Sequence, residues 1–182
     1  WGHGDREAAA IKFLVFNAVA GLGLLAAVFW MGATSDPITF DAFKLARADY
    51  SQTAQVLLLL GFALAFLVKL PVPPFHAWLP DAHTNAPTAG SILLAGLLLK
   101  TGAYGLFRFP PLLFPEGLVT LAPWGMALGA FGVVYGAILA CGQTDAKRLV
   151  AYTSVAHMSI VLMGVCGGVH FALMGAGVEM IA

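Results

Sequence analysis

Two lysines and two histidines stand in or beside long apolar stretches, where ionisable side chains are rare. Lys69 ends one apolar stretch, and Lys100 lies within another, roughly 20 Å from its start if that stretch is helical. His76 belongs to the proline-rich segment between them, and His157 lies roughly 14 Å into a later stretch. These side chains can gain and lose protons, so their placement predicts a path for protons or another cation.

Lys69 stands just before PVPP at 71–74, where prolines remove helical N–H groups. The sequence therefore predicts a broken helix and carbonyl groups without helical partners at Leu67, Lys69 and Leu70. Free carbonyls and the negative end of a helix stabilise an ammonium ion, whereas burial disfavours it. These opposing effects favour a lysine that exchanges its proton. A lysine that extends to the membrane interface is the structural alternative.

Lys100 and His157 are surrounded by apolar residues on both sides. An intramembrane lysine faces a bundle interior or a hydrated cavity, and a lysine paired with an acid for assembly alone is the alternative. His157 shares one helical face with Thr153 and Ser154, so that face must line protein or water. We interpret His157 as a relay residue, with a core histidine bonded to a neighbouring hydroxyl as the alternative.

The segment PVPPFHAWLPDAHTNAP holds His76, Asp81 and His83 between two apolar stretches. Further ligands with suitable spacing are lacking, so we expect no metal site. A relay or gating role for His76 and simple hydrogen bonding within the segment both remain open, and His83 is interpreted as structural. Cys141 and Cys166 lie in apolar runs without metal-ligand spacing, which argues against a disulfide framework or a zinc site.

The composition is that of an integral membrane protein. Of the 182 residues, 60% are hydrophobic and only 10% are charged, whereas soluble domains carry about 25% charged residues. The formal net charge is zero, so nothing indicates a nucleic-acid partner. The expected surroundings are the lipid bilayer.

Apolar runs of about 20 residues can span a membrane, and they divide the chain into helices. We expect an all-α, polytopic bundle in which residues 1–182 form part of one membrane domain. The sequence ends within an apolar run, so we expect it to belong to a longer polytopic chain. The expected spans are 11–32, 53–70 with a broken continuation at 75–82, 87–107, 119–141, 149–167 and a truncated span from 169, and 108–117 is expected to be a loop because of its prolines.

Two long stretches resemble a known family. KLPVPPFHAWLPDAHTNAPTAGSILLAGLLLKTGAYGLFR and CGQTDAKRLVAYTSVAHMSIVLMG are similar to the antiporter-like subunit M family of bacterial respiratory complex I, related to mitochondrial subunit ND-four. The resemblance implies a multi-pass subunit of about fourteen spans in the bacterial inner membrane. It implies that Lys69, Lys100, His76 and His157 line the proton path. Glu179 departs from the expected uncharged residue, and its role is left open.

The resemblance also implies an enzymatic context, a proton-translocating NADH:quinone oxidoreductase, for a chain without its own redox site. The expected partners are the other membrane subunits of complex I, especially neighbouring antiporter-like subunits, and the transported species is the proton. We expect no cofactor in this chain, with FMN, iron–sulfur clusters and quinone in partner subunits. A sodium/proton antiporter subunit of the multi-subunit type and a non-conducting membrane scaffold are the alternatives.

Overall fold

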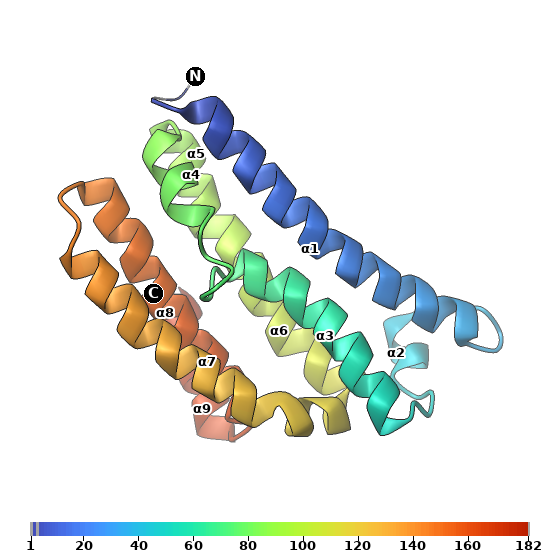
Figure 1. Cartoon of the computed structure of the whole chain (residues 1–182). Coiled ribbons are helices and arrows are strands. Elements are labelled where there is room, and N and C mark those ends of the chain that lie inside the picture. Colours follow the sequence, from blue (N-terminus) through green and yellow to red (C-terminus); the bar gives the residue numbers. More distant parts are fainter. Residues whose placement is uncertain (1, 3, 182) are drawn as a thin grey trace.

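The computed structural model describes residue 2 and residues 4–181. These residues form helices and no strand, so the predicted all-α class is confirmed for them. Figure 1 shows the long helices side by side, with the hairpin of α7 and α8 on one side of α3 and α1 on the other. The elements are α1 (Arg6–Thr34), α2 (Ala42–Leu45), α3 (Gln52–Lys69), α4 (Leu79–Asn85), α5 (Thr88–Leu93), the π-helical turn η1 (Leu94–Leu98), α6 (Leu99–Leu113), α7 (Pro115–Cys141), α8 (Ala146–Cys166) and α9 (His170–Ile181).

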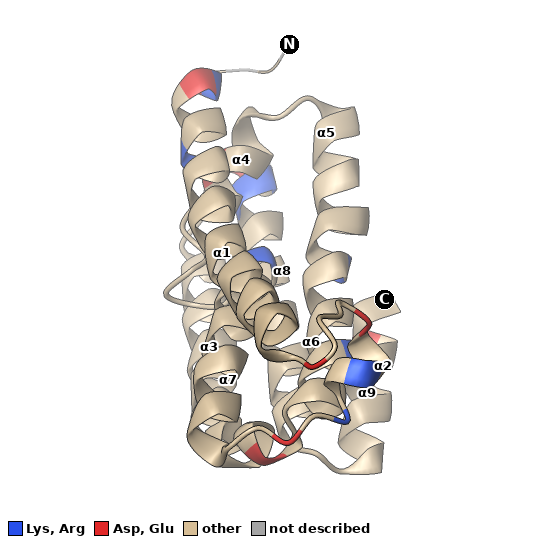
Figure 2. Cartoon of the chain, turned by 90° about the vertical axis from the view of Figure 1, so that its right-hand side faces the viewer, with Lys and Arg blue, Asp and Glu red and all other residues tan. Residues whose placement is uncertain are grey.

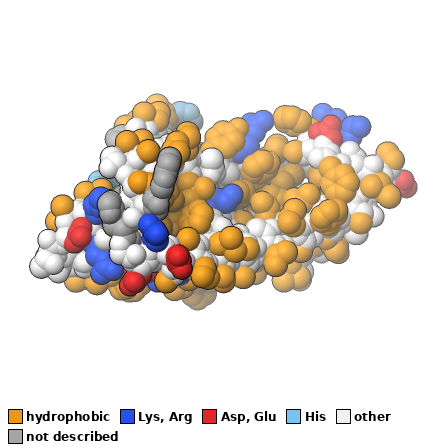
Figure 3. All heavy atoms as spheres, turned by 90° about the horizontal axis from the view of Figure 1, so that it is seen from above, with side chains coloured by type: hydrophobic (Ala, Val, Ile, Leu, Met, Phe, Trp, Pro, Cys, Tyr) orange, Lys and Arg blue, Asp and Glu red, His pale blue; other side chains and the backbone are white. Residues whose placement is uncertain are grey.

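The helices have the length and surface of membrane spans. Within the described residues, five stretches are long and apolar enough to cross a membrane: Arg6–Thr34, Gln52–Lys69, Thr88–Leu113, Pro115–Cys141 and Ala146–Cys166. Most charged positions lie towards the two ends of the bundle, while hydrophobic side chains cover much of the surface (Figures 2 and 3). Large apolar side chains such as Leu22 and Ile138 are 65% and 66% exposed, which suits contact with lipid or other membrane helices. The chain is a polytopic membrane helix bundle.

The expectation of a loop at 108–117 is wrong. α6 continues to Leu113 with Pro110 and Pro111 inside it, and Phe114 alone separates it from α7. The Phe114 N–H donates to the Pro110 carbonyl at 2.9 Å, so the last turn of α6 keeps a helical hydrogen bond despite the prolines. Pro115 opens α7, where the first turn needs no N–H donor. The third span therefore reaches beyond the predicted end at 107.

The predicted interruption after Lys69 is confirmed. α3 ends there, α4 begins at Leu79, and the residues between them form turns. The Trp78 indole is fully buried and donates to the Val68 carbonyl at 2.8 Å. This hydrogen bond holds the residue just before α4 against the last turn of α3. Val72 is also fully buried. Irregular backbone is tolerated at membrane depth where protein covers it, and this break is covered in that way.

Small residues let the helices approach closely. A Cβ atom added at Gly129 or Gly136 of α7 would lie 2.9 Å from the Ser159 carbonyl oxygen or the Ala156 nitrogen of α8. The same kind of contact joins α6 to the end of α3 at Gly102. Close backbone packing of this kind stabilises helix association in lipid, where apolar burial alone contributes little.

Replacing Gly102 with alanine is expected to force α6 away from the end of α3. The new Cβ atom would lie 2.9 Å from the Lys69 Cβ and 3.0 Å from the Leu70 nitrogen. Overpacking of this kind costs about 1–3 kcal/mol, so the thermal midpoint of the assembled protein should fall. The control is Gly21→Ala, since a Cβ there meets no described atom within 4 Å. Equal thermal midpoints for the two variants would contradict this expectation.

Candidate functional site

Lys69 is the last residue of α3 and lies against α6. Its Cβ is the nearest atom to a Cβ built on Gly102, so its side chain leaves α3 beside that helix. The predicted set of free carbonyls needs one correction, because the Val72 N–H donates to the Leu67 carbonyl at 3.3 Å. A bond that spans five residues is possible here because the turn after Lys69 is wider than an α-helical turn. For Lys69 and Leu70, no backbone donor to the carbonyl oxygen is found within the described chain.

His76 is buried between the break and the α7–α8 hairpin. Its ring packs edge-on against Tyr135 of α7, with ring centroids 5.2 Å apart, and lies 6.3 Å from the Tyr152 ring of α8. The His76 Nδ1 atom is buried and has no hydrogen-bond partner among the described residues. A buried polar atom usually has a hydrogen-bond partner, so the His76 Nδ1 marks a place where a water molecule can bind.

Lys100 and His157 line the same pocket, together with Glu179. This open pocket of about 590 Å³ lies between α6, α8 and α9, and the Ser154 hydroxyl also lines it. The Lys100 ammonium donates to the Met180 carbonyl, and His157 Nδ1 is hydrogen-bonded to Glu179 Oε1. Three ionisable side chains thus line one pocket between membrane helices. Ionisable side chains within membrane spans are rare and energetically costly, and they usually have a function.

A π-helical turn comes immediately before Lys100. η1 covers Leu94–Leu98, and α6 starts at the next residue. Turns of this type appear mostly as single insertions in α-helices, frequently at functional sites, and they change the direction of the residues that follow. Ala95 and Gly96 of this turn line the pocket and leave room in it. The regular apolar pattern of 87–107 gives no signal that separates this turn from an ordinary helix.

The four predicted path residues form two groups. Lys69 and His76 do not line the pocket that holds Lys100 and His157. The groups are joined through α8, which carries Tyr152 beside the His76 ring and His157 five residues further on. A path through all four residues must therefore pass along α8 or around α6.

A second charged cluster lies at the end of the bundle near α4. Asp81 pairs with Lys12 of α1 at 2.7 Å and with Arg148 of α8 at 3.3 Å, and Lys147 donates to the Ala86 carbonyl at 3.3 Å. Burial and then the charge of Lys147 lower the pKa of His83, so its imidazole is neutral at pH 7. Sequence reasoning missed this bridge because Lys12 and Asp81 are far apart in the chain.

Replacing Asp81 with asparagine is expected to loosen α4 from α1 and α8. Both ion pairs are half-exposed, and pairs of this kind contribute about 0.2–1 kcal/mol each. The midpoint of heat inactivation should fall slightly, and the fall should shrink at high salt because salt screens exposed charges. Asp49→Asn, at an exposed position in the loop before α3, is the control. A midpoint of Asp81→Asn equal to that of the control at low salt would refute the bridging role.

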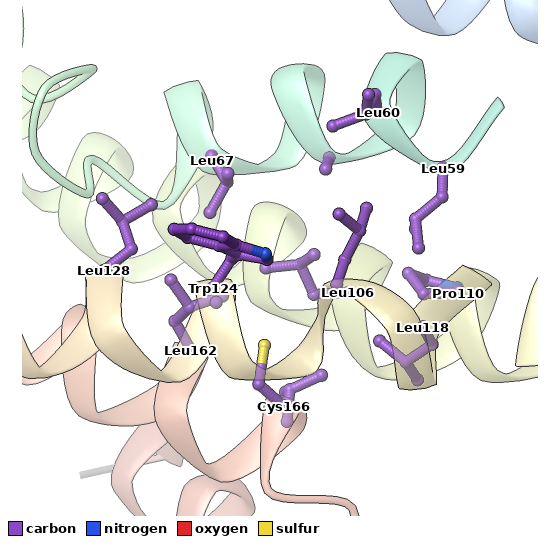
Figure 4. A pocket seen from close by; sticks show the side chains of 14 residues that line it. Leu59, Leu60, Leu67, Leu106, Pro110, Leu118, Trp124, Leu128, Leu162 and Cys166 are labelled. Carbon is purple, nitrogen blue, oxygen red and sulfur yellow. The ribbon is translucent and has the colours of Figure 1, made fainter. Parts of the chain in front are cut away.

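The apolar pocket shown in Figure 4 is unsuited to proton chemistry. It has a volume of about 190 Å³ between α3, α6, α7 and α8, and its lining carries no charged side chain. Leu67, Leu106, Trp124 and Cys166 are among the residues that line it. In the part of the chain that the structure describes, three or more His, Cys, Asp or Glu side chains do not gather as they would around a metal ion. The candidate site is therefore the Lys100 pocket together with the break at Lys69.

Comparisons with known proteins agree on one group of membrane proteins. The family model described as "NADH:quinone oxidoreductase/Mrp antiporter, TM" matches residues 1–182. NADH-quinone oxidoreductase subunit M of Pseudomonas aeruginosa is 49% identical over the whole of this chain, which covers 38% of that relative. Subunit M of Escherichia coli K12 is 48% identical with the same coverage.

Solved structures give the same result. A chain of respiratory complex I from Thermus thermophilus with bound NADH has a TM-score of 0.87 and 34% identity, over 99% of this chain and 41% of that one. A chain of the Mrp complex from Dietzia sp. has a TM-score of 0.78 and 28% identity, over 95% of this chain and 19% of that one. The chain spans well under half the length of each of these proteins.

Proposed function

Because this chain belongs to the transmembrane family of NADH:quinone oxidoreductase and Mrp antiporter subunits, we propose that it is part of a proton-translocating membrane-arm subunit of NADH:quinone oxidoreductase. The observation that carries the proposal is the pocket between α6, α8 and α9 in which Lys100 and His157 meet. The identity to the subunit M relatives extends over the whole of this chain, which supports an NADH:quinone oxidoreductase subunit over an Mrp antiporter subunit.

The residues of this chain hold and pass protons. Lys69, at the end of the broken helix, and His76, whose Nδ1 has no hydrogen-bond partner among the described residues, form one half of the path. Lys100 and His157 form the other half. A proton enters a neutral amine or imidazole and leaves the resulting cation, so each group needs a partner that accepts its proton through a hydrogen bond or a bridging water.

The energy for transport comes from elsewhere in the proposed assembly. FMN, iron–sulfur clusters and quinone belong to partner subunits in this proposal, and this chain moves charge only. The partners are the other membrane subunits, above all neighbouring antiporter-like subunits, in a bacterial inner membrane. The likeness to the Mrp complex makes a sodium/proton antiporter subunit the second candidate, supported by lower identity over a smaller share of that chain.

The test uses the full-length subunit in its assembled complex, reconstituted in lipid vesicles. We expect NADH and quinone to drive acidification of the vesicle lumen, read from a pH-sensitive dye, equally well with and without sodium. Acidification that needs a sodium gradient and ignores NADH would favour the antiporter. An assembled complex that oxidises NADH without any proton movement would refute the proposal.

A further inference from the structure

Glu179 is the one acidic side chain that lines the pocket of Lys100 and His157 in the described chain. It lies on α9, one residue before the carbonyl group that accepts from the Lys100 ammonium. Its carboxylate is hydrogen-bonded to His157 Nδ1, and its side chain is 28% exposed. α9 therefore brings both a backbone acceptor and a carboxylate to the two proposed path residues.

When Glu179 is ionised, its pairing with His157 determines which ring nitrogen carries the proton. An ionised carboxylate accepts hydrogen bonds only, so the hydrogen between it and the imidazole belongs to Nδ1. In the neutral ring the other nitrogen, Nε2, is then free to accept a proton. A proton taken up at Nε2 and another released from Nδ1 to the carboxylate pass the charge through the ring, with no change in the number of protons on it.

The carboxylate also changes how many protons the pocket can hold. Without it, a charged Lys100 and a charged His157, which line the same pocket, would repel each other. With it, the pocket carries a net charge of +1 when both are protonated, and the His157–Glu179 pair is neutral overall. The acid thus allows Lys100 and His157 to be charged together.

We propose that Glu179 is a further proton-holding residue of the path, which receives the proton of His157 and carries the path from α8 to α9. The inference rests on the proposed function. In this step Lys100 releases a proton and becomes a neutral amine, His157 accepts it at Nε2 and gives up the proton on Nδ1, and Glu179 becomes a neutral carboxylic acid. One proton moves at each transfer, and no oxidant or reductant takes part.

The test is Glu179→Gln in the full-length subunit within the assembled, reconstituted complex. Lys100 of α6 and His157 of α8 are the other ionisable side chains that line the pocket within the described chain. We expect fewer protons pumped per NADH at matched amounts of assembled complex, because the His157 imidazole has lost the carboxylate that accepts its proton.

Two further variants separate the roles. Glu179→Asp keeps a carboxylate and should restore part of the pumping. Glu7→Gln, at an exposed position in the first turn of α1, should pump like the wild type. A loss of assembled complex, with unchanged protons pumped per NADH in the complex that remains, would mean that Glu179 is structural only, and the inference would be wrong. Unchanged pumping in Glu179→Gln would also overturn it. If Lys100→Met abolishes pumping in that case, the proposed function stands and only the inference about Glu179 fails. If Lys100→Met leaves pumping intact, the proposed function and the inference both fail.

Discussion

Lys100→Met is expected to abolish most NADH-driven proton pumping while the complex still assembles. Methionine keeps much of the length and apolar volume of the lysine stem but cannot carry a proton. Loss of a proton-transfer group lowers rates by about 10²–10⁴-fold in other proteins, and a fall of this size should appear in vesicle acidification. The amount of assembled complex should change little, because the ammonium makes one hydrogen bond among the described residues, to the Met180 carbonyl.

Lys100→Arg separates charge from proton exchange. Arginine stays protonated and can still donate to the Met180 carbonyl, but it cannot release its proton. If Lys100 exchanges protons, this variant should pump as poorly as Lys100→Met. Wild-type pumping by Lys100→Arg would show that only the charge is needed. Lys44→Met, at an exposed position of α2, is the control for the loss of a lysine as such.

The membrane fold follows from composition and from proline chemistry. Long apolar runs of the right length predicted the spans, and PVPP predicted the interruption after Lys69 because prolines cannot supply helical N–H groups. The same rule failed at Pro110 and Pro111, which lie inside α6. Neighbouring helices hold that segment in place, since Pro110 is fully buried, and local proline preference does not include such packing.

The site was predictable in its residues but not in its partners. Lys100 and His157 stand out because charge is costly in an apolar run. Their meeting with Glu179 depends on α9 folding back on α8, and the apolar pattern around Glu179 has no period that indicates which face it presents. The π-helical turn before Lys100 and the Asp81 bridge also arise from contacts between distant segments. Local sequence patterns do not report such contacts.

The arrangement of the two lysines around α6 determines how they can interact. Lys69 packs against Gly102, two residues after Lys100, and two residues turn a helix by about 200°. By this geometry Lys69 and Lys100 lie on opposite sides of α6, and an α-helix with its side chains is about 10–12 Å in diameter. Two unit charges about 10 Å apart repel by roughly 1.7 kcal/mol at an effective dielectric constant of about 20. That energy is large enough for a charge arriving at one lysine to favour proton release from the other.

Lys69→Met is therefore expected to lower pumping as strongly as Lys100→Met, because both lysines serve one path. The double variant Lys69→Met/Lys100→Met should pump no less than whichever single variant pumps less, since changes within one functional unit are not additive. The measurement is protons moved per NADH oxidised for both single variants and the double variant, each at matched assembly. Two independent paths would instead leave each single variant with a large share of its pumping, and the double variant alone would stop. That pattern would refute the coupling of the lysines across α6, even if each of them carries protons.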